Sequence, residues 1–88
     1  MAWKNVGFIL GSPLSRKILE ALEKKSPLAP LQIAKETNIA RSNVSTKLIE
    51  LRKRHLVECI NPEARKWRLY RITAEGKRTL RESRKIKI

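Results

Sequence analysis

Six polar residues near the middle of this 88-residue chain have side chains suited to hydrogen bonding with a nucleic acid. They are Arg41, Ser42, Asn43, Ser45, Thr46 and Lys47. Arginine pairs bidentately with guanine, asparagine pairs with adenine, and serine and threonine reach either base. Lysine is suited to a phosphate instead. The first five residues therefore predict base contacts on double-stranded DNA, and Lys47 predicts a backbone contact.

A helix from about residue 41 to 54 would hold these side chains on one exposed face. Val44, Leu48 and Leu51 recur at i, i+4 and i+7, which is the spacing of one buried helical stripe. We expect Ile49 to widen that stripe.

A shorter helix and a tight turn are expected before it. Ile33 and Ala34 suit the buried side of that helix. Asn38 suits its end, because asparagine tolerates the left-handed backbone that stops a helix, and Ile39 then returns to the core. Residues 31–57 therefore predict two helices joined by a turn, with the second helix placed to lie against a nucleic acid.

The charge of the chain supports a polyanionic partner. Lysine and arginine number 21 against 8 aspartate and glutamate, a net charge of +13. Residues 1–40 carry 6 basic and 3 acidic groups, whereas residues 41–88 carry 15 and 5, so the positive charge lies mainly in the second half. Such an excess repels itself in a small compact domain, and a nucleic acid would relieve the repulsion. The length predicts a single domain over 1–88.

The first thirty residues predict a scaffold. Residues 2–10 fit either a short helix or an extended arm. Ser12 is a typical helix cap, and the apolar spacing after it predicts a core helix that ends near Lys25. One or two residues of the next connection can pair as a small strand before Pro30 opens another helix.

Residues 57–72 predict a basic hairpin. Strands are expected at 57–60 and 66–72, and residues 61–64 have the composition of a turn. Together with Arg52 at the end of the preceding helix, the hairpin supplies the other expected contacts to the DNA backbone: Arg65, Lys66, Arg68 and Arg71.

Three further residues of this region are interpreted individually. Trp67 either packs on the hairpin face or stacks on a base, and packing is favoured because base stacking is mainly a single-strand device. Cys59 is expected to act as a small hydrophobe within its strand. His55 is expected in a strained position where the helix ends rather than in a catalytic set, for which no nucleophile or orienting partner is evident.

The remaining composition predicts no cofactor, metal site or enzyme activity. One cysteine cannot form a disulfide within the chain, which suits a reducing cytoplasm. A structural zinc site needs about four ligands. No apolar run approaches the roughly 20 residues that a membrane span requires.

Thr73 is expected to cap a last helix over about 74–84. Its apolar content is thin, so this helix must pack on the body of the protein or on another subunit. The basic tail over 84–88 is expected to be a frayed end or an added phosphate contact.

The predicted order of helices followed by a hairpin and a helix resembles a winged helix-turn-helix. IAKETNIARSNVSTKLIELRKRHLVE, RLYRITAEGKRTL and SPLSRKILEAL resemble small prokaryotic, especially archaeal, regulators of the ArsR/MarR-like group, over about residues 8–82. The resemblance implies a mainly α fold with a small β-hairpin (α+β). It also implies a recognition helix over about 41–54 in the major groove, and a wing over about 57–72 that touches the backbone or a minor groove.

The resemblance further implies homodimers on partly palindromic sites, and residues 2–10 and 74–84 are the candidate interface. The chain departs from the group in three ways: it lacks the paired cysteines of ArsR metal sensors and the added helices of MarR proteins, and it has His55 where glycine is common.

A sequence-specific transcriptional regulator is the favoured function. A non-specific DNA- or RNA-binding protein and a winged helix for protein contact are the alternatives.

Overall fold

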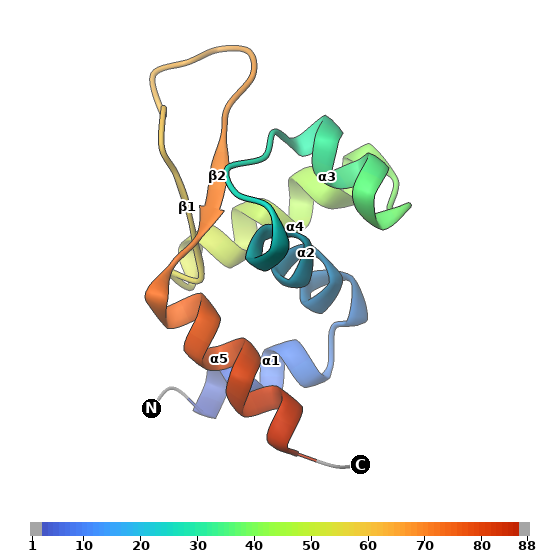
Figure 1. Ribbon diagram of the computed structural model, residues 1–88, viewed down its shortest axis with the longest axis vertical. Coiled ribbons are helices and arrows are strands. Elements are labelled where there is room, and N and C mark those ends of the chain that lie inside the picture. The colour runs from blue at the N-terminus through green and yellow to red at the C-terminus, as the bar shows by residue number, and fades with distance from the viewer. Residues whose placement is uncertain (1–2, 87–88) are drawn as a thin grey trace.

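The computed structural model describes residues 3–86, which form five helices and one antiparallel hairpin (Figure 1). In chain order the elements are α1 (Trp3–Leu10), α2 (Pro13–Lys24), α3 (Pro30–Thr37), α4 (Arg41–Lys53), β1 (Val57–Cys59), β2 (Tyr70–Ile72) and α5 (Ala74–Lys85). This arrangement confirms the predicted α+β fold and its winged helix-turn-helix order. None of the helices between residues 3 and 86 is long and apolar enough to span a membrane.

One apolar cluster holds the helices together, and each described helix contributes to it. The predicted stripe of α4 is confirmed, since Val44, Leu48 and Leu51 are all buried. The prediction that Ile49 widens this stripe is wrong, because its side chain is 58% exposed. Successive helical residues are rotated by about 100°, and that rotation turns Ile49 away from the core, toward the wing.

The first two helices also follow from the sequence. Residues 3–10 form a helix rather than an extended arm, with Val6 and Ile9 buried and Trp3 exposed. The Ser12 hydroxyl accepts the backbone N–H of Ser15 at 3.4 Å and caps α2 as predicted.

The turn between α3 and α4 has the predicted geometry. Asn38 is left-handed, with φ at 59°, and it ends α3 before Ile39 enters the core. His55 takes the same kind of backbone conformation after α4, with φ at 62°. Both positions confirm the expected helix ends.

The hairpin is shorter than the sequence predicts. Val57 pairs with Ile72, and Cys59 pairs with Tyr70, but residues 66–69 are not in a strand. One backbone bond continues beyond the strands, from the N–H of Ile60 to the oxygen of Leu69 at 2.9 Å. The pairing then stops, because the N–H of Leu69 donates to the side-chain Oδ1 of Asn61 at 2.7 Å. The predicted small strand before α3 is present as a bridge between Leu28 and Tyr70, with N···O distances of 3.0 and 2.9 Å.

Helix α5 packs against α1 at the end of the molecule opposite the wing (Figure 1). The Thr73 hydroxyl accepts the N–H of Gly76 at 2.9 Å, which confirms the predicted cap. The prediction of a frayed end starting at Arg84 is wrong, because the helix continues to Lys85 and the Arg84 guanidinium lies 2.9 Å from a carboxylate oxygen of Glu23. Residues 87–88 of the expected tail, and Ala2 of the candidate interface, lie outside the described residues.

Candidate nucleic-acid interface

The first two turns of α4 present the predicted base-contacting residues to solvent. All five are exposed: Arg41, Ser42, Asn43, Ser45 and Thr46. Val44 lies among them and is fully buried, so it anchors the turn that carries them. The apolar stripe of α4 therefore fixes which face of the helix stays open.

Most of these polar groups are free for an external partner. The Thr46 hydroxyl donates to the backbone oxygen of Ser42 at 3.0 Å, an ordinary contact within a helix. Within residues 3–86, the other side chains form no hydrogen bond: Arg41, Ser42, Asn43 and Ser45. The start of α4 thus carries donors and acceptors that the rest of the described chain leaves unused.

The wing brings a second group of cations to the same place. A groove of about 680 Å³ separates the second arm of the hairpin from the starts of α3 and α4. On the α4 side its walls include Arg41 and Ser45, and on the wing side they include Arg65, Lys66 and Arg68. The structure therefore places two segments that lie about twenty residues apart in the sequence on one surface.

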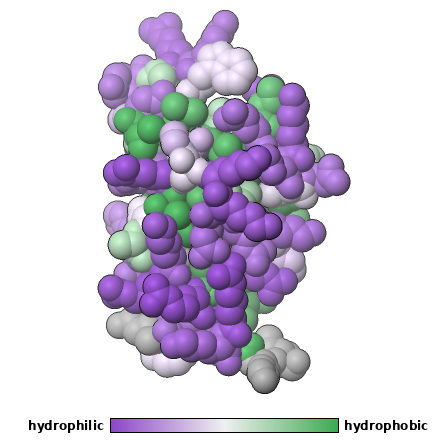
Figure 2. Space-filling model, in the orientation of Figure 1, coloured by the Kyte–Doolittle hydropathy of each residue, from purple (hydrophilic) through white to green (hydrophobic). Residues whose placement is uncertain are grey.

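This surface is strongly cationic because four basic side chains and no carboxylate of the described residues line the groove. Figure 2 shows that hydrophilic side chains cover most of the visible face, with small apolar patches between them. Clefts lined by charges of one sign concentrate the electrostatic potential and attract an oppositely charged partner. The groove has the charge that a phosphate backbone requires.

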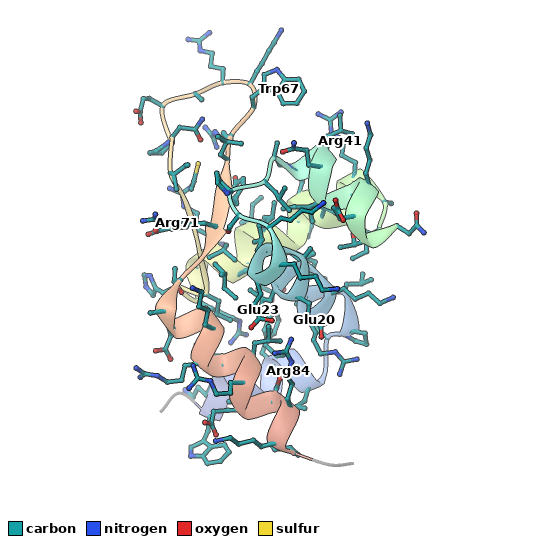
Figure 3. The ribbon with its side chains drawn as sticks, viewed as in Figure 1. Glu20, Glu23, Arg41, Trp67, Arg71 and Arg84 are labelled. Carbon is teal, nitrogen blue, oxygen red and sulfur yellow. The ribbon has the colours of Figure 1, made fainter. Side chains whose placement is uncertain are left out.

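Most carboxylates of the described chain pair with cations away from the groove; Glu63, in the turn of the wing, is the exception within residues 3–86. At the far end, Glu20 and Glu23 both face Arg84 (Figure 3). The hydrogen bond with Glu23 raises the pKa of Arg84 above its ordinary value. The charge of Arg84 is therefore balanced within the molecule, unlike that of the groove arginines.

Three predicted backbone contacts lie outside the groove. Lys47 is half-buried and its Nζ lies 3.8 Å from Oε1 of Glu50. Arg71 forms an ion pair with Glu58 across the hairpin, and Arg52 is exposed in the last turns of α4. The structure therefore brings together Arg65, Lys66 and Arg68 with the start of α4, but does not bring Arg71 to that surface.

Trp67 is the main residue that sequence reasoning misplaced. The prediction that it packs on the hairpin face is wrong, because its side chain is 67% exposed and borders the groove. The signal available in the sequence is its immediate neighbours, because Lys66 and Arg68 are both cationic and favour an arm in solvent. Leu31 and Ile49 also line the groove and were not predicted there.

The structure gives Cys59 a packing role and shows no metal-binding cluster in the part of the chain that it describes. Cys59 packs against the core, as expected of a small hydrophobe, and its thiol lies 3.7 Å from Oδ1 of Asn61. In the described part of the chain, no three histidine, cysteine, aspartate or glutamate side chains converge in a way that could hold a metal ion.

Comparison with known proteins identifies a family whose sequence model matches this chain. Residues 12–58 match the family model for bacterial regulatory proteins of the arsR family. No curated protein matches the chain in sequence.

Solved structures share its fold. The PcaV transcriptional regulator from Streptomyces coelicolor is 27% identical over 80% of this chain and 50% of its own, with a TM-score of 0.70. The transcriptional regulator BldR from Sulfolobus solfataricus is 24% identical over 85% and 54%, with a TM-score of 0.74. Wild-type MarR from E. coli is 18% identical over 81% and 53%, with a TM-score of 0.72. The chain thus spans about half the length of the solved relatives it matches.

Proposed function

Because the chain belongs to the ArsR family of bacterial regulatory proteins, we propose that it regulates transcription by binding specific sites on double-stranded DNA. Helix α4 lies in the major groove, and the wing contacts the neighbouring backbone. One observation carries this proposal: the open polar face of α4 and the basic arm of the wing border a single groove without carboxylates.

The start of α4 has the chemistry for reading bases. Arg41 can donate two hydrogen bonds to guanine, and Asn43 can pair with adenine. Both side chains stand in the first turn of α4, which is the part of a recognition helix that usually reaches base edges. Ser42, Ser45 and Thr46 add shorter hydroxyl groups at the same depth, so they are the remaining base-contacting residues in this proposal.

The backbone contacts come from both segments. Arg65, Lys66 and Arg68 supply them from the wing, with Lys47 and Arg52 as further contacts along α4. Arg71 could join them only by leaving its ion pair with Glu58. Each phosphate that the protein neutralises releases counterions, so the logarithm of affinity falls by about 0.9 per contact for each tenfold rise in salt.

We further propose that the protein acts as a homodimer on a two-fold symmetric site, in the cytoplasm and associated with the nucleoid. The candidate interface is 2–10 and 74–84. Helices α1 and α5 lie side by side at the end away from the groove (Figure 1), so a second copy there would leave both reading surfaces open. Binding, rather than catalysis, is the proposed activity of this chain.

The test is selection of bound sequences from random duplex DNA, followed by affinity measurements on the recovered site. Arg41→Ala and Asn43→Ala should each weaken binding to that site by about 1–3 kcal/mol and binding to random duplex by much less. Arg16→Ala is the matched control, because Arg16 is exposed on α2 and forms no ion pair within residues 3–86.

A recovered motif with two-fold symmetry would support both specificity and the dimer. Equal losses on specific and random DNA would remove the base-reading role of α4. Stronger binding to single strands, or to RNA, than to any duplex would refute the proposal as a whole.

A further inference from the structure

Trp67 stands at the far end of the wing with its indole in solvent. Its side chain is 67% exposed, although tryptophan is a large apolar residue. In Figure 3 it projects beyond the strands, on the side of the wing where Arg41 lies. Its neighbours along the chain are Lys66 and Arg68, so the indole belongs to a cationic arm, and it shares the groove with the exposed Leu31 and Ile49.

The backbone of the wing holds the indole in this position. Trp67 has φ at 59°, a left-handed conformation that bulky residues seldom adopt. Asn61 secures it from the opposite arm: its Nδ2 donates to the oxygen of Trp67 at 3.1 Å, and its Oδ1 accepts from Leu69 at 2.7 Å. Glycine would take this conformation without strain, so the chain keeps an unfavourable residue where its side chain contributes no core packing.

A further contact orders the same loop. The Arg68 Nε donates to the backbone oxygen of Ala64 at 2.9 Å, across the tip. The wing therefore has internal hydrogen bonds on both sides of Trp67, and its shape does not depend on burying the indole.

We propose that Trp67 enters the minor groove of the bound duplex as an apolar wedge against one base step. This inference rests on the proposed function and adds a contact that the α4 surface does not provide. Arg65 and Lys66 would pair with the phosphates on either side, while Arg41 and Ser45 face the major groove across the intervening backbone. Apolar wedges of this kind partly unstack a step and bend the duplex toward the major groove.

The chemistry of the minor groove favours some base pairs for this contact. The groove is only about 6 Å wide, and a G·C pair adds the guanine amino group as a donor that A·T pairs lack. An indole cannot use that donor through its apolar edge. Wedge entry should therefore prefer steps without the amino group, and especially the easily unstacked TA step.

The first experiment separates the indole from the shape of the loop. In a Trp3→Phe background, Trp67 is the sole tryptophan, so quenching of its fluorescence by the selected duplex reports contact. Trp67→Gly keeps the left-handed backbone and removes the ring, so its thermal midpoint should equal or exceed that of the parent. Its affinity for the duplex should nevertheless fall about tenfold or more, by analogy with the loss of base–aromatic contacts, while Trp67→Phe should keep most of it.

The second experiment locates the contact. Replacing guanine by inosine next to the α4 site removes the minor-groove amino group and leaves the major groove unaltered. The parent protein should bind the inosine duplex more tightly and bend it more, as measured by energy transfer between labelled ends, whereas Trp67→Gly should respond to neither change.

The outcomes distinguish this inference from the function beneath it. Equal duplex affinity for the parent and Trp67→Gly, with no quenching, would overturn the wedge and leave α4 recognition intact. A loss confined to single-stranded DNA, or an identical response of both proteins to inosine, would also overturn it. Failure of the parent to bind any duplex would instead refute the proposed function.

Discussion

The contact between Gly76 and the chain before β1 makes a sharp prediction about stability. A Cβ atom at this position would lie 2.1 Å from the backbone oxygen of Leu56 and 2.7 Å from Cγ1 of Ile72. The Leu56 oxygen cannot easily yield, because it accepts the N–H of Thr73 at 3.0 Å. In Gly76→Ala, the first turn of α5 must therefore move by about 1 Å, since real Cβ contacts stay above about 3.0 Å.

The expected cost follows from two opposing effects. Overpacking a core position costs about 1–3 kcal/mol, and a backbone obstacle favours the upper end of that range. Alanine recovers up to about 1 kcal/mol through its higher helix propensity. Gly76→Ala should therefore lower the free energy of unfolding by about 2 kcal/mol. For a domain of this size that corresponds to a fall of roughly 10 °C in the thermal midpoint.

Gly7→Ala is the matched control. Gly7 also lies within a helix, but no atom is found within 4 Å of the position a Cβ would occupy. The same substitution should here raise stability by about 0.5–1 kcal/mol. Both variants are measured by circular dichroism at one fixed protein concentration, because association would shift the midpoint. A Gly76→Ala protein as stable as the parent would refute the packing argument.

Two other pairs of variants test the turn and the charge distribution. Asn38→Val should lower stability by about 1–2 kcal/mol, because a β-branched residue resists the left-handed backbone, whereas Asn38→Gly should cost little; urea titration would compare them. Arg65→Gln should reduce the salt dependence of duplex binding by about one contact, whereas Arg84→Gln should leave it unchanged, because Arg84 is already paired with Glu23. Equal slopes for the two arginine variants would contradict the assigned surface.

Much of the fold could be predicted because its signals are local. The stripe of Val44, Leu48 and Leu51 depends only on helical periodicity, and Asn38 has an intrinsic tolerance for the left-handed region. The cap at Thr73 likewise depends on residues three positions apart. Signals of this range can be read without knowing which elements become neighbours.

The errors arise where the outcome depends on distant residues. Ile49 lies beside the apolar stripe of α4, but the core covers only the stripe itself, so the side chain of Ile49 is exposed in the groove. The second strand ends early because the backbone pairing stops at Leu69: its oxygen still accepts the N–H of Ile60, but its own N–H donates to the side chain of Asn61 instead of to the backbone. The pattern of alternating residues could not reveal that competition, and it therefore predicted a packed Trp67 on a longer strand.

The sequence could predict the kind of contact that the candidate site makes, but not all of the residues that belong to the site. The residue types at the start of α4 already indicated hydrogen bonding to bases, since their donors and acceptors do not depend on the fold. Which hairpin cations join them depends on strand register. Residues alternate between the faces of β2, so Arg71 points outward to Glu58, while Tyr70 on the other face borders the groove.

The bridge between Leu28 and Tyr70 has a mechanical consequence. Its two hydrogen bonds tie the segment leading into α3 directly to the wing, and α3 in turn packs on α4. Hinging of the wing relative to the helices would break both bonds, so the span between the two contact points on DNA is set by the protein. A site lengthened by one base pair between those points would have to be undertwisted, because an extra step must then fit the same rotation between contact points whose spacing the bridge resists changing.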